Sequence, residues 1–64
     1  MEPYQIRVAK EREELQERAY ALFNFLESDA LYALCSEQEQ ELLTAQYHAM
    51  RTYLCILDQR IKLF

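Results

Sequence analysis

The chain has 64 residues, no Gly, one Pro and no Trp, and it carries a formal net charge of −4. This length leaves room for one small domain, which removes only roughly 60% of its unfolded surface from water on folding. Without Gly, tight hairpin turns and the Gly-rich loops that hold phosphates lose their usual residue. The composition therefore disfavours sheet, P-loop and Rossmann architectures and predicts an all-α fold.

The charge balance restricts the partners. Eleven Asp and Glu against seven Lys and Arg give the wrong sign for binding duplex nucleic acid or an anionic membrane surface. The apolar runs are too short to span a bilayer, and no charged segment leads into an apolar leader, so a soluble cytoplasmic protein is expected. Cys35 and Cys55 lack metal-ligand spacing and are predicted to be reduced, partly buried thiols, with no metal bound.

The first predicted element is a helix over residues 3–27. Pro3 suits its first turn, where a missing N–H costs nothing. Arg7 and Glu11, and likewise Glu14 and Arg18, stand four residues apart and predict weak ion pairs on the helix surface. Apolar residues recur along it at helical intervals: Tyr4, Val8, Leu15, Ala19, Leu22, Phe25 and Leu26.

Residues 28–36 form the predicted link. Asp29 is expected to cap a short helical turn over residues 30–34, whose Leu31 and Leu34 would close the end of the core. Ser36 followed by Glu39 fits a capping box, in which the Ser hydroxyl and the Glu carboxylate each accept a backbone N–H. The pattern therefore predicts that a second helix begins at residue 37.

The second predicted helix runs over residues 37–63. Its apolar residues alternate steps of four and three, which is typical of a coiled-coil seam: Leu43, Tyr47, Met50, Leu54, Leu57, Ile61 and Phe64. The link is short, so the two helices are expected to pack antiparallel as one domain, residues 1–64.

Two helices cannot enclose a core by themselves. One seam on each helix leaves apolar residues on the flanking faces: Tyr20, Phe23, Leu42, Ala49, Tyr53 and Ile56. A chain of this size needs further burial, so it is expected to complete its core by homo-oligomerisation, as a dimer or a higher assembly.

Pairing the helices symmetrically about residue 32, so that facing residue numbers add to about 64, places Tyr4 near Arg60. The same register places Arg7 and Glu11 near Tyr53. Two guanidinium groups and two tyrosine rings could clamp phosphates and stack bases. The same residues could instead be a surface ion pair and interface packing, and spacing alone favours this second interpretation.

The polar residues in the middle of the helices do not indicate a functional site. Arg18 falls opposite Gln46 in this register. His48 is the only histidine and has no Ser or Cys at helical spacing beside it, so it is predicted to be a surface residue. Nothing assembles a nucleophile, a base and an oxyanion donor. The sequence therefore predicts no enzyme and no cofactor.

The order of the residues resembles a widespread family of very short proteins from tailed bacteriophages, including crAss-like phages. The resemblance covers essentially the whole chain. It is carried by three segments, with x for any residue: Tyr4-Gln5-x-Arg7-Val8-x-x-Glu11-x-x-Glu14-Leu15, Leu22-x-x-Phe25-Leu26-x-Ser28 and Glu39-x-x-Leu42-Leu43-x-x-Gln46-x-x-x-Met50-x-x-Tyr53-x-x-x-Leu57-x-x-Arg60-Ile61-x-x-Phe64.

Phage helical hairpins of this size include immune-evasion sponges, which sequester the cyclic oligonucleotide signals of CBASS-type defence without hydrolysing them. The resemblance implies such a role in the host bacterial cytoplasm, with a cyclic dinucleotide such as 3′,3′-cGAMP as ligand. It implies that Tyr4 and Tyr53 stack the bases and that Arg7 and Arg60 bind the phosphates. It further implies that Glu11 or Gln46 orients an Arg or reads a base edge. The alternative is a phage hairpin for protein–protein interaction or oligomerisation that binds no nucleotide.

Overall fold

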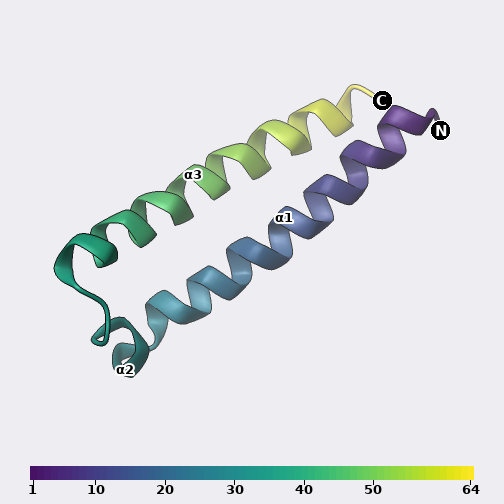
Figure 1. Cartoon of the computed structure of the whole chain (residues 1–64). Coiled ribbons are helices and arrows are strands. Elements are labelled where there is room, and N and C mark those ends of the chain that lie inside the picture. The colour runs from purple at the N-terminus through teal and green to yellow at the C-terminus, as the bar shows by residue number, and fades with distance from the viewer.

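The computed structural model describes all 64 residues as two long helices joined by a short one: α1 (Pro3–Glu27), α2 (Asp29–Tyr32) and α3 (Glu37–Lys62). The long helices run antiparallel, so the two termini lie at one end and α2 at the other (Figure 1). This confirms the predicted all-α hairpin with a short helical turn in its link. The second helix ends at residue 62, one residue before the predicted end.

Local hydrogen bonds mark where the long helices begin. Pro3 occupies the first turn of α1, and Gln5 Oε1 accepts from the backbone N–H of Glu2 at 2.9 Å. At α3, Ser36 Oγ accepts from the backbone N–H of Glu39 at 3.1 Å. The reciprocal bond to the Glu39 carboxylate is absent, so the predicted capping box is only half formed. Glu39 is exposed, and water can solvate its carboxylate instead.

The link differs from the prediction in its cap and in its packing. Ser28, not Asp29, caps α2, because Ser28 is extended and its Oγ accepts from the N–H of Leu31 at 3.4 Å. Asp29 is instead the first residue of α2, where a carboxylate suits the positive helix end. Leu31 and Leu34 do not close the core, since both are exposed on the outside of the link.

We expect Ser36→Ala to lower the free energy of unfolding by about 1 kcal/mol, because it leaves the N–H of Glu39 without its side-chain acceptor. Urea unfolding followed by far-UV circular dichroism measures the loss. Thr44→Ala, in the interior of α3, is the control and should change stability less. An unchanged midpoint for Ser36→Ala would show that water replaces the cap fully.

The core is a narrow seam between α1 and α3. Leu57 is the only residue with no exposed surface, and it is buried among residues that the apolar spacing predicted: Val8, Leu15, Met50, Leu54 and Ile61. Ala19 is buried further along α1. The end of the hairpin at which the two termini lie is hereafter called the open end. There the seam gives way to an exposed contact, in which the Tyr4 and Phe64 rings meet edge to face with centroids 5.8 Å apart.

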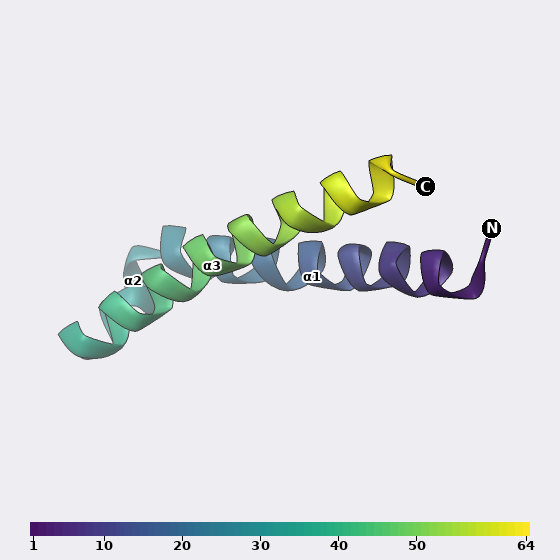
Figure 2. The same cartoon turned by 90° about the horizontal axis from the view of Figure 1, so that it is seen from above.

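The hairpin is too slender to bury its remaining apolar side chains. Its long helices cross at an angle and diverge toward their ends (Figure 2). The radius of gyration is 14.6 Å, whereas a compact domain of this length would have about 11 Å. As predicted, the apolar residues of the flanking faces are all exposed in the single chain: Tyr20, Phe23, Leu42, Ala49, Tyr53 and Ile56.

Candidate functional site

The register of the hairpin differs from the symmetric pairing predicted from the sequence. Arg12 faces Asp58 and Phe23 faces Tyr47, so facing residue numbers add to 70 rather than to about 64. The cause is the link: it carries the start of α3 beyond the end of α1 (Figure 2). There Gln40 Nε2 donates to the carbonyl oxygens of the link, at 2.8 Å to that of Tyr32.

This register brings only part of the predicted site together. The Tyr4 ring contacts the ring of Phe64, with centroids 5.8 Å apart. In the register given by Arg12 and Asp58, Glu11 falls level with residue 59, next to Arg60, and Arg7 lies one turn nearer the termini. Four predicted site residues therefore belong to the half of the hairpin that ends at the two termini: Tyr4, Arg7, Glu11 and Arg60. All of them are exposed. The predicted neighbourhood of Arg7 and Tyr53 is wrong by about two helical turns.

Gln46 is separated from the rest of the predicted site. It precedes Arg60 by 14 residues along α3, which is about 21 Å at ~1.5 Å per residue. In the observed register it lies opposite residue 24 rather than opposite Arg18. Within one chain, therefore, Gln46 does not reach a ligand that is held by the arginines at the open end.

The charged groups at the open end are free of ion pairs. The only salt bridge in the molecule joins Arg12 Nε to Asp58 Oδ1 at 2.8 Å. Neither predicted intrahelical pair forms, whether of Arg7 with Glu11 or of Glu14 with Arg18. Such exposed pairs gain little against water and side-chain entropy. Arg7 and Arg60 consequently present their guanidinium groups to solvent with no carboxylate bound to them.

The Arg12–Asp58 salt bridge forms only in the observed register and gives a testable prediction. Its two side chains are 36% and 47% exposed, so we expect a coupling free energy of about 0.2–1 kcal/mol. A double-mutant cycle with Arg12→Ala and Asp58→Ala, followed by urea unfolding at low and high KCl, measures it. Zero coupling at low salt would contradict the observed pairing.

The face of the hairpin opposite the predicted site residues carries a groove of about 610 Å³, which the sequence did not predict. Arg12 and Asp58 lie at one end of it. At the other end, Phe23 and Tyr47 meet with ring centroids 5.8 Å apart. Arg51 donates to Tyr47 Oη at 3.1 Å and lies over the same ring. The spacing of Tyr47 and Arg51, four residues apart on one helix, was the available signal.

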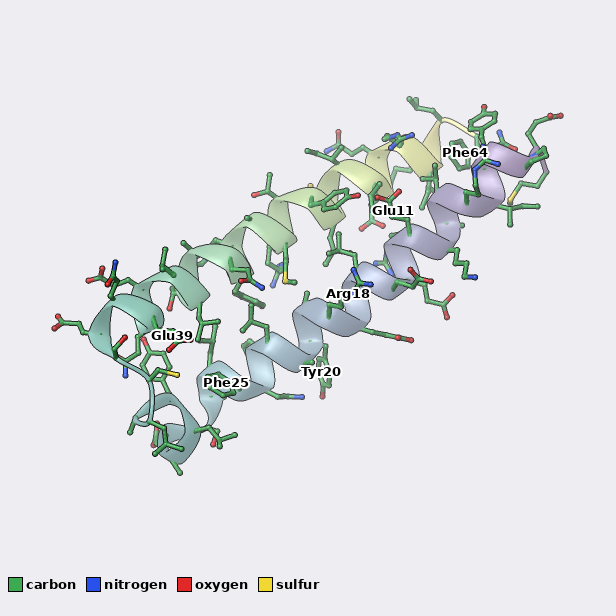
Figure 3. All side chains as sticks on the ribbon, in the orientation of Figure 1. Glu11, Arg18, Tyr20, Phe25, Glu39 and Phe64 are labelled. Atoms are coloured by element: carbon green, nitrogen blue, oxygen red, sulfur yellow. The ribbon has the colours of Figure 1, made fainter.

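None of the six predicted site residues lines this groove. Tyr53 and Leu54 show why: they are neighbours in sequence and therefore point about 100° apart around α3, and only Leu54 faces the groove. In Figure 3, Glu11 and Arg18 reach toward the space between the long helices, whereas Tyr20 points away from α3. The predicted site and the groove thus occupy different faces of one hairpin.

The thiols and the histidine lie outside the predicted site. Cys35 is half-buried in the link, and Cys55 is exposed beside the groove, so the prediction that both are partly buried is wrong for Cys55. Both thiols are free. His48 is exposed, as predicted, and its ring lies 5.8 Å from that of Tyr47. No helix has the length and apolar character to cross a bilayer.

These features define a class of protein: a very small helical hairpin that displays unpaired arginines and tyrosine rings from helix surfaces. Comparison with known proteins gives the family. The chain belongs to the Sequestin family, whose profile matches residues 2–63. It is also 43% identical, over 95% of its length and 94% of the relative's, to an uncharacterized 7.5 kDa protein from the denB–rIIB intergenic region of Enterobacteria phage T4. No solved structure matches the chain.

Proposed function

We propose that this chain binds and sequesters a cyclic di- or oligonucleotide second messenger of CBASS-type defence, without cleaving it, in the cytoplasm of an infected bacterium. One observation carries the proposal. Arg7 and Arg60 are exposed and have no carboxylate partner, although the chain has an excess of acidic residues. The exposed ring of Tyr4 lies at the same end of the hairpin.

The chemistry of these groups fits a nucleotide that carries two phosphates. A guanidinium group offers two parallel N–H donors to a phosphate, which makes a charge-assisted pair stronger than a neutral hydrogen bond. Tyr4 and Tyr53 each present an exposed ring on which a base can stack. Glu11 would repel a phosphate, so its role in the proposal is to orient Arg60 or to accept from a base edge.

The family assignment supports the same function. The name Sequestin suggests a sequestering role, and the T4 relative places this type of chain in a bacteriophage. A sponge needs binding groups only, and the proposal accordingly assigns no catalytic residue. The single imidazole, His48, lies about 18 Å along α3 from Arg60, at ~1.5 Å per residue.

Isothermal titration calorimetry with a panel of 3′,3′-cGAMP, cyclic di-GMP, cyclic di-AMP and the linear dinucleotide pGpA tests the proposal. We expect saturable binding of at least one cyclic dinucleotide and weaker binding of the linear one, because a ring pre-organises both phosphates. No heat and no thermal shift with any member would contradict the proposal.

A second candidate function is a protein–protein interaction module that binds no nucleotide. It is favoured by the exposed apolar residues of α3, among them Leu42 and Ile56, because a monomeric soluble protein seldom exposes a large continuous apolar patch. It predicts that the whole panel gives no heat while a phage or host protein binds saturably. If the purified chain covers this surface by self-association, this candidate loses its support.

A further inference from the structure

A second line of residues, separate from the core seam, runs along the exposed surface of α3. It repeats every seven residues and is hereafter called the outer stripe: Leu42, Gln46, Ala49, Tyr53, Ile56, Arg60 and Leu63. Every member is exposed, and Leu42, Ile56 and Leu63 are each more than half exposed. A repeat of seven residues is the spacing at which one helix face continues to meet a partner helix.

The amount of exposed surface indicates a second copy as the occupant. The chain exposes 5077 Å², whereas a compact monomer of its 7.7 kDa mass exposes only about 4,300 Å². The excess of about 750 Å² per chain is close to the roughly 800 Å² that each partner buries in a stable interface. A copy of this chain supplies the same excess, so a dimer removes it from both chains.

The order of residues in the outer stripe gives the direction of pairing. We propose that two copies pack antiparallel through their outer stripes, about a two-fold axis close to Tyr53. Antiparallel pairing about this axis brings Leu42 near Leu63 of the other copy. It likewise brings Ala49 near Ile56, so a small side chain meets a large one. The stripe is therefore complementary to itself, as a two-fold interface requires.

The same axis completes the ligand site, a step that rests on the function proposed above. Within one chain Gln46 lies about 21 Å from Arg60 along α3, at ~1.5 Å per residue. Across the axis, Gln46 of one copy comes beside Arg60 of the other, with the two Tyr53 rings between the two Gln46–Arg60 pairs. The assembly then offers two equivalent Gln46–Arg60 sets, about 21 Å apart at ~1.5 Å per residue, and each set is completed by residues of both copies.

The groove face is a poorer self-interface. Its charged groups already bond within the chain, since Arg12 pairs with Asp58 and Arg51 donates to Tyr47. It is also hollow, so two flat surfaces cannot close against each other there. The outer stripe contains one charged residue, Arg60, and places it next to an amide across the axis.

Sedimentation equilibrium without nucleotide tests the interface independently of the proposed ligand. We expect the wild-type chain to have twice the mass of 7.7 kDa. Ile56→Glu should raise the dimer dissociation constant by at least about tenfold, because it buries an unpaired carboxylate. Ile6→Glu is the matched control, since Ile6 and Ile56 are 54% and 53% exposed and Ile6 lies on α1. A monomeric wild-type chain, or dissociation by Tyr20→Glu rather than by Ile56→Glu, would overturn the proposal.

Disulfide cross-linking tests the direction of pairing and does not depend on the strength of the dimer. In a background with Cys35→Ser and Cys55→Ser, the variant Tyr53→Cys should form a disulfide-linked dimer under mild oxidation, because the axis passes close to residue 53. The control His48→Cys, on another side of α3, should stay monomeric on a denaturing gel. Efficient cross-linking of Ala49→Cys with itself, without cross-linking of Tyr53→Cys, would overturn the antiparallel arrangement.

Discussion

Leu57→Ala is expected to lower the free energy of unfolding by about 2–5 kcal/mol, the range for removing a buried Leu side chain from a packed core. Leu57 is the only fully buried side chain, and it belongs to a core cluster with residues from both long helices. A chain of 64 residues has a total stability of about 3–10 kcal/mol at typical values per residue. The substitution therefore removes a large share of the total stability.

Urea unfolding followed by far-UV circular dichroism measures this effect, at one protein concentration because self-association adds to apparent stability. Leu34→Ala is the matched control: Leu34 is 82% exposed in the link, and its truncation should change stability by less than about 0.5 kcal/mol. Equal losses for the two variants would show that the seam around Leu57 is not the core of the protein.

Arg60→Ala is expected to weaken binding of 3′,3′-cGAMP by about 10- to 100-fold, as removal of one charge-assisted hydrogen bond of about 1.5–3 kcal/mol implies. Calorimetry measures the change, and raising the KCl concentration should weaken wild-type binding in the same direction. Arg51→Ala is the matched control, because Arg51 lines the groove on the opposite face and should bind the nucleotide as the wild type does.

Two outcomes would contradict this role of Arg60. If Arg51→Ala weakens binding and Arg60→Ala does not, the nucleotide occupies the groove with Phe23 and Tyr47 instead of the open end. If Arg60→Ala lowers helicity, Arg60 acts in packing rather than in binding. Circular dichroism on the same samples separates these cases from a specific loss of phosphate contacts.

The sequence predicted the helices closely because their signals are local. Pro3 and Ser36 mark the helix starts, and the apolar spacing identified the buried Val8, Leu15 and Leu57. The register was not predictable in the same way. The seam repeats every seven residues, so sliding one helix by about one repeat still places apolar residues opposite one another.

What selects among these registers is the geometry of the link. Gln40 bonds to link carbonyls and Ser28, rather than Asp29, caps α2; both choices depend on backbone direction that residue spacing does not encode. The predicted candidate site consequently combines residues that lie far apart along the hairpin, as Gln46 and Arg60 do on α3. The sequence does not reveal the groove, because Tyr47 falls within the apolar repeat of the seam and that repeat carries no sign of its bond to Arg51.

Capture and release of the intact signal tests the central claim most directly. The purified chain would be mixed with 3′,3′-cGAMP, separated from free nucleotide by filtration, and then denatured by heat, and the released nucleotide would be quantified by liquid chromatography and mass spectrometry. We predict that the filtrate is depleted and that heating returns the nucleotide chemically unchanged. A filtrate that retains all of the nucleotide, or the appearance of linear cleavage products, would contradict sequestration.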